Sequence, residues 1–235
     1  MTTIVLVPVD LPQEDDVPEV IIDLLAETTV VPAGIYEVPT QTALSQAKQH
    51  DDGRAADVID DLAARFRDAG ATVKPKIRYT HTREQTVDKL RSDEACDVIL
   101  VPKYTERIEW LLVPIRGVVN IDRITTFITS LSLEGLQRVT LFHVAPSESK
   151  RSHGQATLNY VTDVLVSSQV PEKKIASETV VGSDPIDPII ERAKNHDAIV
   201  MGGTKPSLTE RIFGRIPNRI GQRAGCPVFV ITPKE

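Results

Sequence analysis

Three glycines and two basic residues between positions 202 and 215 could together hold a phosphate group. Gly202 and Gly203 end the apolar run "DAIVMGG", and Gly214 with Arg215 precedes the helix-like stretch "NRIGQRAG". Glycines let backbone N–H groups approach phosphate oxygens, and the start of a helix adds unpaired donors and a positive dipole end. Lys205 and Arg215 add cationic side chains. The segment therefore predicts an anion site where a strand enters it and a helix leaves it.

The same residues also fit a purely structural interpretation. Gly202 to Thr204 can form an ordinary tight exit from a strand, and the basic side chains can be solvated. The loop alone leaves both interpretations open, so the rest of the chain has to supply the context.

Composition restricts the class of protein to which the chain can belong. The chain has 235 residues, of which 41% are hydrophobic, enough for one large or two small domains with their own cores. A formal net charge of -6 gives no broad basic field, which argues against nucleic-acid binding. Cys96 and Cys226 are far apart and no signal peptide follows Met1, so we expect a cytoplasmic protein. No apolar run reaches the roughly 20 residues of a spanning helix, so we expect no membrane insertion.

An internal repeat of about 100 residues organises the chain. "IVLVPVD" at 4–10 resembles "WLLVPIR" at 110–116, and "CDVILVP" at 96–102 resembles "HDAIVMG" at 196–202. All four runs are continuous apolar blocks, typical of parallel strands that are buried on both faces. We therefore expect two domains, residues 1–105 and residues 106–235.

The second half predicts a complete set of alternating strands and helices. We expect strands at 109–115, 138–146, 176–182, 198–202 and 226–232, and helices at 121–135, 156–169, 184–197 and 218–225. Gly135 is the expected stop of the first helix, and Asp187 with Pro188 the expected start of the third. Right-handed crossovers make this order a doubly wound parallel sheet, whose ligands bind beyond the carboxyl ends of the strands. The loops after 115 and 202 are then the candidate site.

The first half predicts a shortened copy of this arrangement. Strands are expected at 3–9, 28–38, 71–80 and 97–102, and helices at 17–26, 42–69 and 82–95. Only "KYTERIE" separates the last strand from the next half, too few residues for a helix and a return strand. The first half therefore lacks its fourth helix and fifth strand, which leaves its fourth strand as an open edge. We expect the halves to pack as a pseudo-dimer, with "CPVFVIT" buried between them or between chains.

Sequence motifs of common enzymes are missing. GxSxG, GxxxxGK[ST], GxGxxG and HExxH do not occur, so the sequence gives no support for a hydrolase, a P-loop NTPase, a dinucleotide enzyme or a zincin. We expect His143, inside "LFHVAP", to be a hydrogen-bonded sheet residue, and the acidic cluster "QEDD" at 13–16 to be a surface loop.

Residues 108–233 resemble the universal stress protein family. The resemblance rests on "LLVPI", "LFHVAP", "DAIVMGG" and above all the tail "FGRIP" followed by "RAGCPVFVI". It implies two flavodoxin-like (Rossmann-like) α/β lobes, the first a degenerate domain of the same family, with dimerisation along the last strand. It also implies ATP or AMP as the ligand to consider. The positions it assigns to ligand binding are Pro114, Ile115, Arg116, Val144, Gly202, Gly203, Thr204, Lys205, Gly214, Arg215 and Ile216.

Several of these positions depart from the family pattern. Lys205 stands where a second glycine is usual, and Arg215 replaces a hydroxyl residue. Arg116 replaces the aspartate that normally follows the first strand, whereas the first half keeps Asp10 there. The basic residues either change the specificity of the pocket to another phosphorylated metabolite or block the pocket.

These observations favour a non-catalytic regulatory protein with a site for an adenine nucleotide or other phosphorylated small molecule in its second domain. The same departures from the family pattern are also compatible with a docking subunit for a transporter or another partner that binds no small ligand. A slow nucleotide hydrolase is a third reading, but no base or nucleophile can be named for it. We expect a homodimer.

Overall fold

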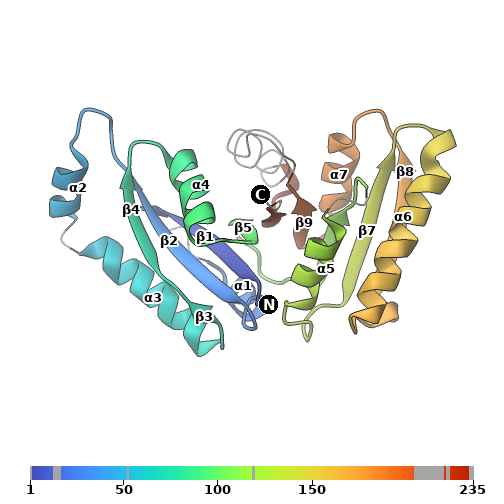
Figure 1. Cartoon of the computed structure of the whole chain (residues 1–235), viewed down its shortest axis with the longest axis horizontal. Helices are drawn as coiled ribbons and strands as arrows, with labels where there is room; N and C mark the ends of the chain where they lie inside the picture. The colour runs from blue at the N-terminus through green and yellow to red at the C-terminus, as the bar shows by residue number, and fades with distance from the viewer. Residues whose placement is uncertain are drawn as a thin grey trace.

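The computed structural model describes residues 2–12, 17–51, 53–117, 120–203, 220 and 223–232. Within these residues, one sheet runs through the whole molecule and carries helices on both faces (Figure 1). The strand order is β3-β2-β1-β5-β10-β9-β6-β7-β8, with β4 also paired to β2. We call β1 to β5 with their helices the first lobe, and β6 to β10 with theirs the second lobe.

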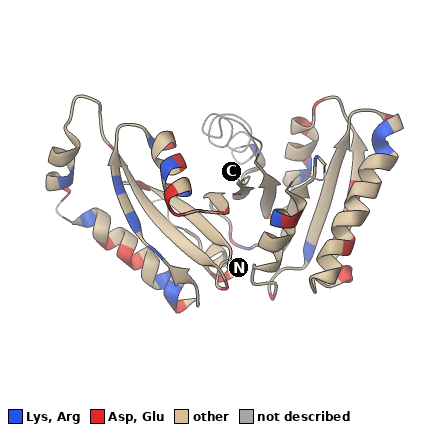
Figure 2. Ribbon diagram, viewed as in Figure 1, with Lys and Arg blue, Asp and Glu red and all other residues tan. Residues whose placement is uncertain are grey.

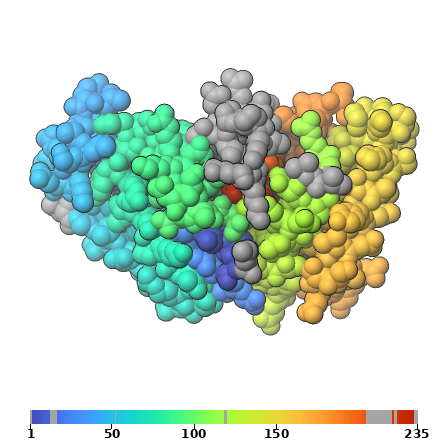
Figure 3. Space-filling model, in the orientation of Figure 1, coloured from blue at the N-terminus to red at the C-terminus, as the bar shows by residue number. Residues whose placement is uncertain are grey.

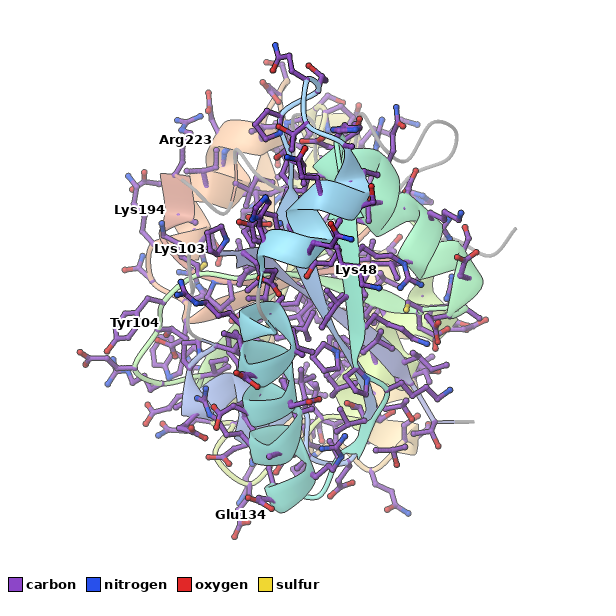
Figure 4. The ribbon with its side chains drawn as sticks, turned by 90° about the vertical axis from the view of Figure 1, so that its left-hand side faces the viewer. Lys48, Lys103, Tyr104, Glu134, Lys194 and Arg223 are labelled. Atoms are coloured by element: carbon purple, nitrogen blue, oxygen red, sulfur yellow. The ribbon has the colours of Figure 1, made fainter. Side chains whose placement is uncertain are left out.

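The first lobe is the shortened unit that the sequence predicts, except that the single strand expected at 71–80 is divided into two strands. It contains β1 (Ile4–Leu11), α1 (Glu19–Leu24), β2 (Thr29–Glu37), α2 (Leu44–His50), α3 (Arg54–Asp68), β3 (Thr72–Val73), β4 (Lys76–Thr80), α4 (Arg83–Asp93) and β5 (Val98–Val101). From β5 the chain passes directly to the second lobe. In the connection, Lys103 and Tyr104 extend away from the protein (Figure 4), and Tyr104 is 72% exposed.

The second lobe is the complete unit. It contains β6 (Trp110–Pro114), α5 (Ile121–Thr129), β7 (Arg138–Ala145), α6 (Glu148–Ser167), the short 3₁₀ helix η1 (Glu172–Lys174), β8 (Ile175–Val181), α7 (Ile186–Ala193), β9 (Ala198–Gly202) and β10 (Val228–Ile231). All four strand pairings inside this lobe are parallel, as predicted.

Two hydrophobic cores lie on opposite faces of the sheet. One contains side chains from α1, α3, α5 and α6, and the other contains side chains from α4 and α7. Alternate residues of each strand enter different cores, so Val5 and Val7 face the first core while Leu6 faces the second. Because both faces are covered, the strands are continuous apolar runs, which is the pattern that the sequence analysis used.

The seam between the lobes is formed by β5 and β10, which pair antiparallel. Val228 lies opposite Val101 and Ile231 opposite Val98, and all four residues of β10 are completely buried. The expected burial of "CPVFVIT" between the lobes is therefore confirmed, within a single chain. In Figure 3 the red C-terminal atoms emerge between green atoms of the two lobes. The edge along which the family resemblance implied dimerisation is thus already occupied by β5.

An aspartate repeats the same backbone contact in each lobe. Asp97 precedes β5, donates its N–H to the carbonyl of Ile4 at 2.9 Å and accepts the N–H of Ile4 on Oδ2 at 3.0 Å. Asp197 precedes β9, donates its N–H to the carbonyl of Trp110 and accepts the N–H of Trp110 on Oδ2, both at 2.9 Å. The two aspartates occupy matching positions in "CDVILVP" and "HDAIVMG", so the structure supports the predicted repeat.

Several predicted helix boundaries are wrong; the helix expected at 156–169, for example, begins at Glu148. The expected helix at 42–69 is broken into α2 and α3, with Gly53 in the left-handed region at φ 87°. The helix expected to stop at Gly135 ends at Thr129, where the Ser130 hydroxyl bonds back to the carbonyl of Phe127. α7 begins at Ile186 rather than at Pro188, because the carboxylate of Asp184 accepts the Ile186 N–H at 2.9 Å.

Residues of both charges are spread along the described helices and strands (Figure 2). α3, for example, carries acidic residues and Arg54, Arg65 and Arg67 along the same helix.

His196 is a buried histidine that makes stability depend on pH. Its Nδ1 lies 2.9 Å from the carbonyl of Arg192, and its Nε2 lies 2.9 Å from Oγ1 of Thr140. Burial lowers the pKa of His196 below its usual value of 6.5, while the Arg192 carbonyl acts in the opposite direction. The unfolded chain therefore takes up a proton at a higher pH than the folded one does. We expect the free energy of unfolding to fall as the pH drops below about 6.5.

Urea titrations between pH 7.5 and pH 5 measure this effect. Replacing His196 with Gln should flatten the pH dependence, because the unfolded-state protonation disappears with the imidazole. His153 is exposed and provides the matched control, since H153Q should leave the dependence unchanged. If the free energy of unfolding depended on pH equally in H196Q and in the unmodified protein, His196 would not be the cause of the dependence.

Candidate functional site

The candidate site lies at the carboxyl ends of β6, β7 and β9 in the second lobe. β6 pairs with β7 on one side and with β9 on the other, so the loops after β6 and β9 leave the sheet next to each other. The chain order reverses between these two strands, which is the point where open α/β sheets bind ligands. The structure therefore brings together the described members of the predicted site, namely Pro114, Ile115, Arg116, Val144, Gly202 and Gly203.

The Gly202–Gly203 strand exit is tied to the start of α5. The carbonyl of Gly203 accepts a hydrogen bond from Nδ2 of Asn120 at 3.2 Å, and the N–H of Gly203 donates to the carbonyl of Ile231 at 2.7 Å. The Gly203 amide is thus engaged in the sheet and is not free for a ligand. Asn120 is in the left-handed conformation, with φ 68°. It supplies the junction that positions the β9 exit against α5.

The amino end of α5 carries no side-chain cap. Asn120 is its N-cap residue, but its side chain points to Gly203 instead of to the first helical amides. Uncapped N–H groups at a helix start attract anions. Next to them in sequence, Arg116 is exposed and forms no ion pair with any described residue. The edge therefore combines helix amides and a guanidinium.

His143 supports this edge from inside the protein. Its Nδ1 lies 2.7 Å from the carbonyl of Ile115, the last residue before Arg116, and the imidazole is 8% exposed. On its other side the ring contacts Gly154 of α6, where a Cβ would lie 2.3 Å from Cδ2 of His143. The expectation that His143 is a hydrogen-bonded sheet residue is confirmed. The ring fixes the carbonyl from which the Arg116 loop departs.

Five predicted site residues lie outside the described residues. These are Thr204, Lys205, Gly214, Arg215 and Ile216. The acidic cluster at 13–16 also lies outside them. The roles given to these residues by the family resemblance stay predictions.

Among its described residues, the first lobe shows no equivalent anion edge. Asp10, the carboxylate retained after its first strand, pairs with Nε of Arg83 at 2.5 Å, and Arg83 begins α4. The segment after β5 contains no glycine. A carboxylate that is paired in this way adds negative charge and no free donors, so the second lobe is the better candidate for an anion.

Arg123 connects the candidate site to the first lobe. Arg123 lies on α5, and its guanidinium donates to the carboxylate of Asp97 at 2.8 Å and to the carbonyl of Thr232. Thr232 in turn donates its hydroxyl to the carbonyl of Cys96 at 2.9 Å. The helix that starts at the candidate site is therefore anchored across the seam. Sequence reasoning missed both Asn120 and Arg123; the position of Asn120 directly before the periodic "IDRITTF" was the available signal.

The described residues contain no group of three or more His, Cys, Asp or Glu residues that could hold a metal ion. None of the described helices combines the length and apolar character that a bilayer crossing requires. Cys96 and Cys226 are both free and buried, and burial raises their thiol pKa values to about 12 and about 11.

Comparison with known proteins finds a family match within the second lobe. Residues 136–232 match the model of the universal stress protein family. The whole chain is similar to a universal stress protein from Archaeoglobus fulgidus DSM 4304, with a TM-score of 0.62, 15% identity and 98% of each chain covered. It is also similar to the cytoplasmic domain of a prokaryotic cation chloride cotransporter, with a TM-score of 0.58 and 12% identity, covering 99% of this chain and 96% of that one. No curated protein matches the chain.

Proposed function

We propose that this chain, whose residues 136–232 form a universal stress protein domain, is a regulatory protein that binds an adenine nucleotide or another phosphorylated small molecule in its second lobe. The observation that carries the proposal is the hydrogen bond from Asn120 to Gly203, which places the uncapped start of α5 beside the β9 exit. Arg116 adds a cation at the end of the neighbouring strand. An anion held there would gain both charge-assisted hydrogen bonds and the helix dipole.

The proposal includes the division into domains 1–105 and 106–235, a cytoplasmic location and a role without catalysis. The described residues supply donors and positive charge at the candidate site, but no nucleophile next to a base. A homodimer is also part of the proposal. Because both edges of β10 are paired within the chain, such a dimer must use a different surface.

Nucleotide should raise the melting temperature of the protein. A ligand at about 100 times its dissociation constant stabilises the folded state by roughly 2.7 kcal/mol. We expect this shift with ATP or AMP in differential scanning calorimetry, and we expect R116A to reduce it strongly, because the guanidinium pairs with phosphate. R138A is the matched control, since Arg138 is exposed at the opposite end of β7. No shift with any adenine nucleotide or inorganic phosphate would remove the proposal.

A docking subunit without a small ligand is the second candidate. Its support is the likeness of the whole chain to a transporter's cytoplasmic domain, which extends over both lobes at the level of the fold. The calorimetric titration separates the two candidates, because a docking subunit gives no shift with nucleotide or phosphate.

A further inference from the structure

A pocket of about 250 Å³ opens on the first lobe, away from the candidate anion site. It lies between the carboxyl ends of β1 and β2 and the junction of α2 with α3. The second lobe has one unbroken 20-residue helix, α6, where the first lobe has α2 and α3. The pocket therefore depends on the break between α2 and α3. The internal repeat predicts no equivalent pocket in the second lobe, where α6 is unbroken.

The floor of the pocket is apolar. Leu11 and Ala55 are buried, Val58 is half-buried, and the ring of Tyr36 forms one wall. Tyr36 is itself held by stacking on Tyr79, with 5.4 Å between ring centroids and 28° between the planes. A wall fixed in this way offers a preformed surface to an apolar group.

Asp51 places a fixed carboxylate at one side of the pocket. Its Oδ2 accepts the N–H of Ala55 at 3.1 Å and the hydroxyl of Tyr79 at 2.9 Å. Burial and the bond to Asp51 raise the pKa of Tyr79 to about 12, so the phenol stays a donor. Its Oδ1 has no hydrogen-bond partner among the described residues. One oxygen is thus structural, and the other is available to a ligand.

Arg54 provides the opposite charge at the rim. It is the first residue of α3 and lines the same pocket, and no carboxylate of the described residues lies within ion-pair distance of it. His50, the last residue of α2, is exposed at the same rim. The pocket thus presents a guanidinium and a carboxylate above an apolar floor. At about 30 Å³ per water molecule, its volume corresponds to about eight waters, which suits a ligand of amino-acid size.

We propose that this pocket binds a free α-amino acid with an apolar side chain. The ligand's carboxylate pairs with Arg54, its ammonium group pairs with Oδ1 of Asp51, and its side chain lies on Leu11, Val58 and the ring of Tyr36. A zwitterion matches the two opposite charges, whereas a simple anion or cation would leave one of them unpaired. The proposal is independent of nucleotide binding in the second lobe.

Isothermal titration with L-phenylalanine tests the proposal. 3-Phenylpropanoate lacks the ammonium group and 2-phenylethylamine lacks the carboxylate, and we expect each to bind at least about tenfold more weakly, since tenfold corresponds to about 1.4 kcal/mol. R54Q should weaken L-phenylalanine binding by a similar factor. R67Q removes the same charge from the exposed far end of α3 and should have no effect. Absence of binding by L-phenylalanine and L-leucine, or equal affinity for 3-phenylpropanoate, would overturn the proposal.

Backbone amide shifts locate the ligand. Addition of L-phenylalanine should move the amide resonances of Ala55 and Val58 and leave that of Gly203 in place, whereas a nucleotide should do the reverse. V58F fills the floor at a half-buried position, and it should abolish the L-phenylalanine shifts while the rest of the spectrum stays that of the folded protein. Shifts at Gly203 with L-phenylalanine would assign the amino acid to the second lobe and refute this site.

Discussion

Replacing Phe229 with Ala should destabilise both lobes at once, by about 3–5 kcal/mol. Phe229 is completely buried in β10, lies opposite Leu100 of β5 and Val200 of β9, and packs against Phe127 with 5.3 Å between ring centroids. Truncation leaves a cavity beside the seam, which the surrounding strands cannot close without losing their register. Since the two strands that flank β10 belong to different lobes, the loss is shared between the lobes.

Two probes can follow the lobes separately during urea unfolding. Fluorescence of Trp110, the only tryptophan in the chain, reports on the second lobe, and hydrogen exchange of Val5 and Leu6 in β1 reports on the first. We expect both midpoints to move together in F229A. V166A, at a 40% exposed position on α6, is the control and should change the free energy of unfolding by less than about 0.5 kcal/mol. A first lobe that kept its original midpoint would show that the seam does not couple the lobes.

Replacing Gly154 with Ala should destabilise the protein by about 1–3 kcal/mol, although alanine is the better helix former. The added Cβ would lie 2.3 Å from Cδ2 and 2.7 Å from Nε2 of His143. The ring cannot retreat freely, because its Nδ1 is bonded to the carbonyl of Ile115. Either α6 moves outward or the bond to Ile115 is lost, and the second outcome would disturb the loop that carries Arg116.

A double-mutant cycle distinguishes this contact from a general helix effect. In the H143A background the imidazole is gone, so G154A should become neutral or stabilising by up to about 1 kcal/mol, as expected for Gly to Ala in a helix. Chemical denaturation of the four proteins gives the coupling energy. G154A that is equally destabilising in both backgrounds would rule out the His143 contact as the cause.

Most of the second-lobe fold could be predicted because its strands are continuous apolar runs. Runs such as "LLVPI" and "AIVMG" are buried on both faces, and their order along the chain leaves one right-handed topology for a parallel sheet. The internal repeat made it possible to predict the strand pattern of the first lobe and the absence of its last strand. What the sequence left open was whether β10 pairs within the chain or between chains, because the exposed edge of the fourth strand is equally suited to either.

Local boundaries were harder to predict than the topology. The apolar spacing of residues 42–69 is compatible with one helix, and only Gly53, with its positive φ, marks the break that creates the first-lobe pocket. At the candidate anion site, the strand ends were predictable from the sheet, but the Asn120 side chain that joins α5 to Gly203 was not. Such a contact depends on the distance between two loops, which periodicity does not encode.

The seam formed by β5 and β10 has a consequence for how the two units can diverge. In an assembly of identical subunits, any substitution is present in every copy, and separation on dilution is always possible. Here the partners are covalently joined, so their local concentration stays in the millimolar range or above however dilute the protein is. Asp10 is paired with Arg83 in one unit, while Arg116 in the other unit forms no ion pair with any described residue. A tethered pair is thus free to specialise its halves for different small molecules without ever falling apart.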